Sequence, residues 1–174
     1  MNHIRSIVLS IIILVGLNHS MVMAKDSSRE FDMRNSATPA YNLLTGGQPS
    51  LRDLEKLAKQ GNKVVVNLRT KGEFDKFDEK AAVEKLGMKY VSIEIGGGED
   101  INLENVKRLD AALNGLNEPA LVHCASSNRV GGLLAYRAFK LQNQSASEAL
   151  AFGKKSGMRS TVKTVKKLIA AESK

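Results

Sequence analysis

Short apolar runs alternate with amphipathic segments along most of this chain, and that alternation restricts the fold more than any other feature. Three runs are predicted strands: KVVVNLR has the character of a buried strand, KYVSIEI alternates apolar and other side chains, and ALVHC is a short apolar run. Strands that alternate with helices form a mainly parallel central sheet flanked by helices. The sequence therefore predicts an α/β sandwich of three layers. In such folds, ligands bind beyond the carboxyl ends of the strands.

Helix signals separate the predicted strands. Ser50 is an expected N-cap with Asp53 three residues later, as in a capping box, and Gly61 ends the amphipathic segment that follows. Asn102 starts another helix, whose apolar residues recur at helical spacing before Pro119. Helices are also expected over FDKFDEKAAVEKLG, NRVGGLLAYRAFKLQ, SASEALAFG and STVKTVKKLIAA, and YNLLTGGQPS is expected to hold a short strand and a turn.

The N-terminal segment differs from the rest of the chain. A short basic start precedes an apolar stretch from Ile7 to Leu17, and small or modest residues lead up to Ala24. This pattern indicates a secretory signal peptide, residues 1–24; the alternative is an uncleaved membrane anchor. We therefore expect a periplasmic or secreted protein that is not inserted in the membrane after cleavage. Residues 25–40 are expected to form a mobile arm, and residues 41–174 one domain.

Composition argues against several classes of function. The formal net charge is +8, but the lysines are dispersed and no aromatic residues are interleaved with them, so we expect no nucleic-acid partner. Beyond residue 24 the chain has one cysteine and one histidine, Cys124 and His123, which are too few for a zinc site. Gly96, Gly97 and Gly98 lack the lysine of a nucleotide-binding loop. We therefore expect neither a metal nor a cofactor.

Cys124 is the only cysteine, so it cannot form a disulfide within the chain. It is either a small buried hydrophobic residue or a reactive thiol. It lies at the end of a predicted strand, and small or polar residues follow it as far as Arg129. Amides of such a loop can turn inward to form an anion site, and this positive field favours the thiolate. Because Arg129 can hold two oxygens of a tetrahedral anion, the group suits attack on phosphorus or on a sulfane-sulfur donor.

The loop VHCASSNRVG resembles the HC…R-S/T-G loop of cysteine-dependent protein phosphatases. It is most similar to the bacterial β-lactamase-hydrolase-like branch of the dual-specificity phosphatases. GGQPS, VVVNLRTKGEF, GMKYVSIEI and PALVHCASSNRVGGLLAYRAF follow one another in the order of that branch. The resemblance implies a protein-tyrosine-phosphatase-like sandwich and a phosphatase that uses neither metal nor cofactor.

The resemblance also implies roles for the residues of the loop. Cys124 would be the nucleophile that forms a phosphocysteine, and Arg129 would bind the phosphate and stabilise the transition state. Backbone amides would cradle the phosphate oxygens, those of Ala125, Ser126, Ser127, Asn128 and Arg129. A hydroxyl of Ser126 or Ser127 would hydrogen-bond the thiolate or assist its departure. His123 would orient the loop rather than act as a base.

The expected general acid is Asp100. In the resemblance, Ile95 occupies the position where an aspartate is usual, so the acid would be a neighbour: Asp100, Glu99 or Glu94. We favour Asp100, because the three preceding glycines allow the segment to swing over the site. The alternative is that these side chains are solvated loop carboxylates and that the chain has no general acid.

The loop departs from the usual phosphatase pattern in two ways. Four residues separate Cys124 from Arg129 where five are usual, and four is also the length found in rhodanese sulfurtransferases. Ser127 stands where a glycine is usual, so a positive φ there would strain the backbone by about 1–2 kcal/mol.

We therefore expect an exported phosphatase of the tyrosine or dual-specificity type, which acts on a phosphorylated protein or small molecule. Two alternatives stay open: a sulfurtransferase that carries a persulfide on Cys124, and a non-catalytic module that binds phosphorylated ligands. Arg69 and Glu73 are expected either to border the site or support the loop, or to form an internal ion pair.

Overall fold

The computed structural model describes residues 31–74, 76–115 and 117–172, and the predicted signal peptide lies outside them. The strands are β1 (Ala37–Ala40), β2 (Leu43–Gly46), β3 (Val64–Asn67), β4 (Lys89–Ser92) and β5 (Ala120–His123). The helices are α1 (Leu51–Lys59), α2 (Glu79–Lys85), α3 (Leu103–Leu113), α4 (Asn128–Leu141), α5 (Ala146–Lys155) and α6 (Val162–Glu172).

The strands form one sheet in the order β1-β2-β5-β3-β4, in which every neighbouring pair except β1 and β2 is parallel. The predicted α/β fold with a mainly parallel sheet is therefore confirmed. Because β5 lies between β2 and β3, the residues that follow these three strands emerge side by side at one edge of the sheet. This edge is where the chain places Cys124.

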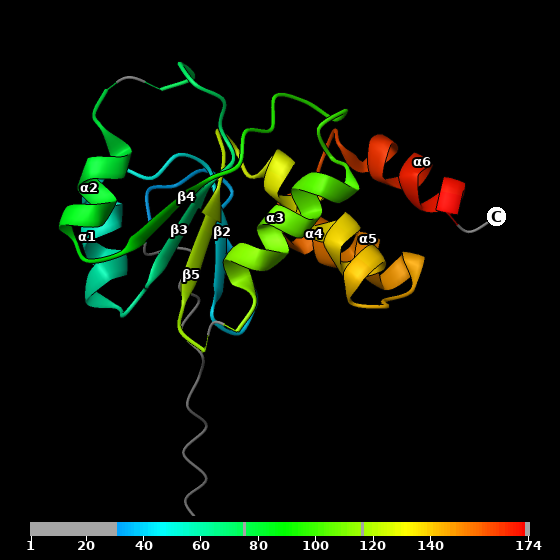
Figure 1. Ribbon diagram of the computed structural model, residues 1–174, viewed down its shortest axis with the longest axis horizontal. Coiled ribbons are helices and arrows are strands. Elements are labelled where there is room, and N and C mark those ends of the chain that lie inside the picture. The colour runs from blue at the N-terminus through cyan, green and yellow to red at the C-terminus, as the bar shows by residue number, and fades with distance from the viewer. Residues whose placement is uncertain (1–30, 75, 116, 173–174) are drawn as a thin grey trace, which may run out of the picture.

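The sheet lies between two layers of helices (Figure 1). α1 and α2 cover one face, and α3, α4, α5 and α6 lie on the other (Figure 1). Successive residues of β5 serve different cores: Leu121 is buried with Leu54 of α1, whereas Val122 is buried with Leu133 of α4. Since full burial of one such side chain contributes about 1.5–3 kcal/mol, both layers stabilise the strand that precedes the cysteine.

Residues 31–40 belong to the folded domain, and the prediction of a mobile arm over 25–40 is wrong for this part. Phe31 and Met33 are only 7% and 4% exposed, and they belong to the core beneath α1. β1 adds an antiparallel edge strand to β2. The polar composition was misleading because an antiparallel edge strand needs to bury only one of its faces. The remainder of the predicted arm lies outside the described residues.

The predicted helix signals are found, with one difference in length. Ser50 accepts a hydrogen bond from the amide of Asp53 and Asp53 accepts one from the amide of Ser50, so the capping box of α1 is confirmed. α2 is shorter than predicted, because Asp78 caps its first turn by accepting from the amide of Ala81. Residues 70–74 and 76–78 instead belong to a long connection after β3, and this connection supplies part of the site described below.

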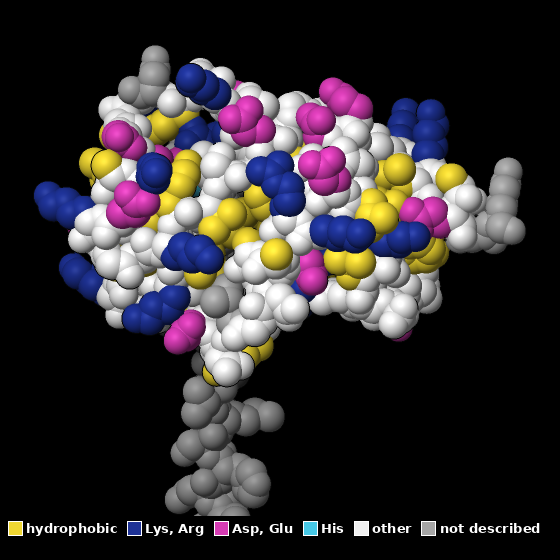
Figure 2. Space-filling model, viewed as in Figure 1, with side chains coloured by type: hydrophobic (Ala, Val, Ile, Leu, Met, Phe, Trp, Pro, Cys, Tyr) yellow, Lys and Arg dark blue, Asp and Glu magenta, His cyan; other side chains and the backbone are white. Residues whose placement is uncertain are grey.

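No described helix is long and apolar enough to cross a membrane. On the face of the molecule shown in Figure 2, basic and acidic side chains are interspersed. This face therefore offers no continuous basic surface of the kind that follows a nucleic-acid backbone.

α4 and α5 approach closely at two glycines. A Cβ on Gly131 would lie 2.5 Å from the carbonyl oxygen of Gly153, and one on Gly153 would lie 2.7 Å from the carbonyl oxygen of Gly131. Both distances are far below a normal van der Waals contact, so only glycine fits at either position. This contact places the end of α5 beside the first turn of α4, where the cysteine loop ends.

We predict that Gly131→Ala destabilises the protein by about 1–3 kcal/mol, because backbone atoms rather than flexible side chains would have to move. Thermal unfolding followed by circular dichroism should show a melting temperature several degrees below that of the wild type. Lys154→Ala, on the exposed side of α5, is the control and should change stability by less than about 0.5 kcal/mol. Equal melting temperatures for Gly131→Ala and the wild type would contradict the close approach of the two helices.

Candidate active site

The cysteine loop is supported on both sides by the neighbouring strands. Gly47, which follows β2, forms a bridge with Ser126, and a Cβ on Gly47 would lie 2.8 Å from the carbonyl oxygen of Ala125. On the other side, the amide of Leu68 donates to the carbonyl of His123 at 2.8 Å. The loop therefore occupies the predicted position beyond the carboxyl ends of the parallel strands.

The carbonyl groups of the loop are bound from outside. Three of them accept hydrogen bonds: Ser126 from Asn35 Nδ2 at 3.0 Å, Ser127 from the amide of Gly131 at 2.9 Å, and Asn128 from the hydroxyl of Thr161 at 3.0 Å. In a trans peptide, the amide of the next residue points opposite to the carbonyl. The amides that follow these carbonyls are thereby turned towards the inside of the loop, which supports the predicted anion site.

Ser127 is the strained residue of the loop. Its φ is 67°, in the left-handed region, and it is the N-cap of α4 without a side-chain capping bond. A serine in this conformation strains the backbone by about 1–2 kcal/mol, which is the strain expected where a serine replaces the usual glycine. Its buried hydroxyl donates to the carbonyl of Ser156 at 3.0 Å. Because a hydroxyl has one hydrogen, Ser127 cannot also donate to the Cys124 thiolate in this arrangement, which leaves Ser126 as the candidate.

The side chain of Asn128 fastens the loop to the connection between α5 and α6. Its Oδ1 accepts from the amides of Arg159 and Thr161 at 2.8 and 3.3 Å, and its Nδ2 donates to the hydroxyl of Ser160 at 2.8 Å. These contacts lie on the outer side of the loop. Any contact of Asn128 with an anion therefore involves its backbone amide, as predicted, and not its side chain.

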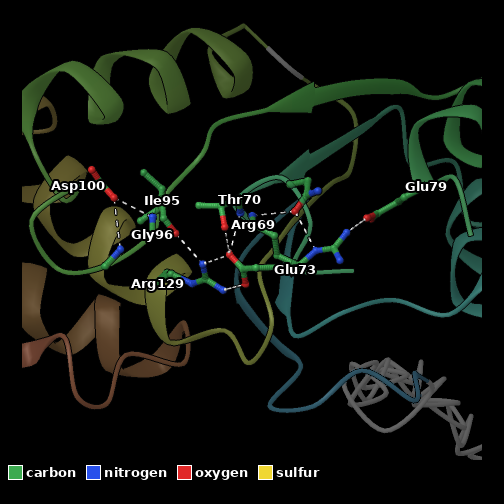
Figure 3. Close-up of polar contacts among 10 residues, drawn as sticks. Arg69, Thr70, Glu73, Glu79, Ile95, Gly96, Asp100 and Arg129 are labelled. Atoms are coloured by element: carbon green, nitrogen blue, oxygen red, sulfur yellow. Dashed lines mark hydrogen bonds and ion pairs between the residues drawn. The ribbon is translucent and has the colours of Figure 1, made fainter. Parts of the chain in front are cut away.

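Arg129 is held by an ion pair with Glu73. Its Nη1 and Nη2 donate to Oε1 and Oε2 of Glu73 at 2.7 and 2.6 Å, and Nη1 also donates to the carbonyl of Ile95 at 2.6 Å. Thr70 fixes the carboxylate from the opposite side, through its amide at 2.8 Å and its hydroxyl at 2.7 Å. Figure 3 shows Glu73 between Thr70 and Arg129. Of the two alternatives left open for Glu73, the structure thus shows a direct bond to the candidate site.

These contacts divide the guanidinium of Arg129 into two halves. A guanidinium has five N–H donors, and the described bonds use both hydrogens of Nη1 and one of Nη2. The hydrogen of Nε and the second hydrogen of Nη2 form the remaining edge, which has the spacing for two oxygens of one phosphate. Glu73 and Ile95 therefore orient Arg129, and its remaining edge is the candidate anion clamp.

The ion pair changes the pKa of both partners. Hydrogen bonding to Arg129 is the main cause that lowers the pKa of Glu73 from an ordinary 4.5 to about 2. The same hydrogen bonds raise the pKa of Arg129, and the nearby Cys124 raises it further. The two side chains are only 13% and 28% exposed, so water screens this pair less than it screens a surface ion pair. Both groups are therefore ionised throughout the neutral range.

Cys124 follows β5 directly and is buried at the start of the loop. Its side chain is 1% exposed and belongs to the core cluster that includes residues of α3 and α4. Arg129 is not turned out into water, and Cys124 contributes to the raised pKa of its guanidinium. The thiol is therefore buried, as one of the two interpretations of a lone cysteine expects, but it is also close enough to a cation to raise the pKa of that cation, as the other interpretation requires.

His123 belongs to a separate buried network on the opposite face of the sheet. Its Nε2 lies 2.7 Å from Oε1 of Glu79, and Glu79 also pairs with Arg69. Burial alone would raise the pKa of Glu79, but the close contact with His123 and the charge of Arg69 together lower it. Arg69 is fixed in turn by Asn67, whose Oδ1 accepts from its Nε at 3.2 Å. The network holds the side chain of the residue next to Cys124, which supports the predicted orienting role of His123.

Glu79 is a residue that sequence reasoning missed. Its only signal was an acidic residue at the start of a helix, which is a common way of stabilising a helix and points to no partner. Likewise, an ion pair between Arg69 and Glu73 was one of the two alternatives for these residues, whereas each pairs with a different residue.

The segment that carries the candidate acids forms a turn next to the site. Oδ2 of Asp100 accepts from the amides of Gly96 and Gly97 at 2.7 and 3.3 Å. In Figure 3, Asp100 lies beyond Gly96 as seen from Arg129, with its carboxylate directed at these amides. Asp100 is thus placed beside Ile95, which binds Arg129, while Oδ2 serves as an acceptor in the turn. Its role as the general acid stays a prediction.

Glu99 and Glu94, the other two candidate acids, are less well placed than Asp100 to act as the general acid. The carboxylate of Glu99 folds back over Gly97, within 2.6 Å of where a Cβ on that glycine would lie. Glu94 lines a polar pocket at the end of β4, together with Arg69. Among the described residues, no group of three or more His, Cys, Asp and Glu side chains is placed to hold a metal ion.

Comparisons with known proteins agree with this geometry. The family whose model matches is described as a DSP-PTPase phosphatase fused to NAD+ kinase, and the match covers residues 17–172. A comparison with curated proteins gave no match.

Several solved structures share the fold. A DUF442 protein from Shewanella putrefaciens CN-32 is 24% identical, with a TM-score of 0.63 over 80% of this chain and 91% of that one. TpbA of P. aeruginosa, solved with pTyr, is 18% identical, with a TM-score of 0.53 over 78% of this chain and 87% of that one. The core catalytic domain of the PP-IP phosphatase SIW14 from S. cerevisiae is 17% identical, with a TM-score of 0.57 over 81% of this chain and 92% of that one.

At these identities the solved structures speak for the fold alone, and the family is shown by the match over residues 17–172. The described residues form one α/β domain around the cysteine loop, which corresponds to the phosphatase part of that description. The chain therefore belongs to the family of DSP-PTPase phosphatases.

Proposed function

We propose that the protein is a cysteine-dependent phosphatase of the tyrosine or dual-specificity type, which hydrolyses phosphate monoesters through a phosphocysteine. One observation carries this proposal: Glu73 and Ile95 occupy one side of the Arg129 guanidinium, and the edge that remains is suited to two phosphate oxygens, next to Cys124. The order of the segments from GGQPS to the cysteine loop further supports a place in the β-lactamase-hydrolase-like branch.

In the proposed first step, the thiolate of Cys124 attacks phosphorus. A bond forms between Sγ and phosphorus, and the bond from phosphorus to the ester oxygen breaks. The remaining edge of Arg129 and the inward amides of the loop hold the three non-bridging oxygens, whose interactions strengthen as charge develops in the transition state. These donors are already fixed before the substrate binds, so little reorganisation is needed during the reaction.

The leaving oxygen needs a proton, for which Asp100 is our candidate. The described hydrogen bonds of its side chain use Oδ2, so Oδ1 is available to carry the proton. In the second step, a water molecule gives a proton to the same carboxylate and attacks phosphorus. The bond between Sγ and phosphorus then breaks, and inorganic phosphate and the thiolate are released.

The substrate and the location are also proposals. A similar structure, TpbA, was solved with pTyr bound, which supports a phosphorylated substrate for this chain. The apolar N-terminal segment supports export to the periplasm or the exterior, although it lies outside the described residues.

We predict that the protein hydrolyses 4-nitrophenyl phosphate in the presence of a chelator, and that vanadate inhibits it. Cys124→Ser should abolish turnover because the hydroxyl is a far weaker nucleophile than the thiolate. The melting temperature of the variant is the control for folding. Sulfur transfer from thiosulfate to cyanide without phosphatase turnover would contradict the proposal in favour of a sulfurtransferase. Anion binding by both proteins with neither activity would favour a non-catalytic module.

We predict that Glu73→Gln lowers kcat/KM for 4-nitrophenyl phosphate by about 10²-fold, because it releases Arg129 from its fixed orientation. The variant should also change the pH dependence of stability. The pKa of Glu73 is lowered from 4.5 to about 2 in the folded protein, so its contribution is complete above pH 4.5 and is lost as the pH falls towards 2.

Urea unfolding at about pH 6 and about pH 3 measures this contribution. The wild type should lose more unfolding free energy between the two values than Glu73→Gln does. Glu55→Gln, an exposed acid on α1, is the matched control. The same loss in the wild type and in Glu73→Gln, with unchanged kcat/KM, would show that the ion pair does not form in solution.

We predict that Asp100→Asn lowers kcat by about 10²–10⁴-fold for phenyl phosphate, whose leaving group needs a proton, and much less for 4-nitrophenyl phosphate. Steady-state kinetics with both esters measures the difference. Glu99→Gln is the control and should reduce the two rates equally or not at all. If Asp100→Asn instead affects both esters to the same extent, Asp100 acts only in the turn with Gly96 and is not the acid.

A further inference from the structure

A concave surface lies beside the cysteine loop, outside the candidate site described above. It is a pocket of about 460 Å³ between the residues that follow β2 and the connection that follows β3. The residues that line it are Gln48, Pro49, Ser50, Leu51, Arg52, Phe74, Lys76 and Phe77.

The sheet topology places this pocket next to the phosphate site. β2 and β3 are the two neighbours of β5, so the segments after them flank the loop that follows β5. Gly47 contacts that loop directly through its bridge with Ser126, and the next residue, Gln48, already lines the pocket. On the other side, Glu73 binds Arg129 and the following residue, Phe74, lines the pocket. A phosphate held by the loop would therefore have its ester group within reach of the pocket.

Apolar side chains form much of the pocket wall. Leu51 is 48% exposed, and among the described residues only it and Tyr41 are large hydrophobic side chains that stand exposed. Phe74 and Phe77 pack edge to face, with their ring centroids 5.0 Å apart. The guanidinium of Arg69 covers the Phe74 ring at 4.6 Å and fixes its orientation. The capping box that starts α1 uses Ser50 and Asp53, so helix formation does not require a leucine at position 51.

The charges at this pocket have one sign among the described lining residues. Arg52 and Lys76 are exposed cations there, and none of these residues is a carboxylate. The polar pocket at the end of β4 differs, because its three cations are balanced by Asp78, Glu79 and Glu94. The pocket beside the cysteine loop thus combines an apolar wall with a positive rim, which complements an apolar group that carries a negative charge.

We propose that this pocket binds the leaving group of the substrate and selects phosphate monoesters whose leaving group is apolar and bears a second anionic group. Leu51, Phe74 and Phe77 contact the apolar part, and Arg52 and Lys76 attract the anion. This inference rests on the proposed phosphatase function and specifies its substrate class.

Three aryl phosphates test the proposal: phenyl phosphate, biphenyl-4-yl phosphate and 4′-carboxybiphenyl-4-yl phosphate. Their phenols have similar acidity, so differences in kcat/KM report binding of the leaving group and not its chemical reactivity. We expect kcat/KM to rise about tenfold from the first ester to the second, which partial burial of one ring supports. A further rise of about threefold is expected for the carboxylate, and added salt should reduce it.

Variants locate the effect. Leu51→Asn should bring the ratio of kcat/KM for the biphenyl and phenyl esters close to one. Arg52→Gln should remove the increment due to the carboxylate while keeping that due to the second ring. Tyr41→Asn is the matched control, because it removes the other exposed apolar side chain from the turn between β1 and β2, at the opposite edge of the sheet. It should leave all three values of kcat/KM unchanged.

Failure of this inference differs from failure of the proposed function. Equal kcat/KM for the three esters, with hydrolysis that depends on Cys124, would overturn the pocket assignment and leave the phosphatase in place. If the wild type hydrolyses none of the three esters, the phosphatase proposal fails, and their binding to the wild type, measured by calorimetry, still tests the pocket assignment. Affinities that rise in the order expected for kcat/KM would support the assignment, and equal affinities for the three esters would reject it.

Discussion

The ion pair between Arg129 and Glu73 is the interaction on which the rest of the candidate site depends. Arg129 lies in the first turn of α4, Glu73 belongs to the connection after β3, and Ile95 follows β4, so one guanidinium joins three separate segments. Thr70 holds the carboxylate in place, and Glu73 in turn determines which edge of Arg129 is left for a ligand. If the pair were absent, Arg129 would be a long flexible side chain, and positioning it for a phosphate would cost side-chain entropy in every catalytic cycle.

A second network of charges supports the same strand from the opposite face. Glu79 binds His123 and Arg69 where all three side chains are almost completely buried. Buried ion pairs contribute little net stability, because the desolvation of the charges offsets most of their attraction. A hydrophobic cluster at this position would stabilise the fold at least as well. The two networks therefore serve to position side chains. One fixes His123, before Cys124, on one face of the sheet, and the other fixes Arg129, after Cys124, on the opposite face.

The sequence was sufficient for those features that depend on local pattern. The alternation of strands and helices predicts the parallel sheet, and the position of Cys124 after an apolar run predicts where its loop lies. Ser127 stands where a glycine is usual, so the sequence indicates that a positive φ there would strain the backbone, and the φ of Ser127 is 67°. These inferences succeed because each rests on a few neighbouring residues and a strong steric or hydrophobic preference.

Features that depend on distant contacts were beyond the sequence. Glu73 and Arg129 are 56 residues apart. The sequence offered a place at the site as one of two alternatives for Glu73, but nothing in it indicates Arg129 as the partner until the connection after β3 is folded. Phe31 and Met33 were assigned to a mobile arm because their neighbours are polar, although both complete the core beneath α1. In each case one or two side chains are decisive, and the segment around them has no periodic pattern.

The short loop explains why a serine is acceptable at its most constrained position. With four residues between Cys124 and Arg129, the chain has to reverse direction within the loop, and Ser127 does so with its φ of 67°. Gly157 leaves room for the Cβ of Ser127, because a Cβ on Gly157 would lie only 2.6 Å from it. The hydrogen bond from the Ser127 hydroxyl to the carbonyl of Ser156 offsets part of the backbone strain.

All these supporting contacts come from outside the loop. Asn35, Gly47 and the connection between α5 and α6 hold its outer surface, so the inner amides need no partner within the fold to keep their direction. A loop that is shaped in this way retains the geometry of an anion site before any anion arrives. Such preorganisation is the physical condition for electrostatic stabilisation of a phosphoryl transition state.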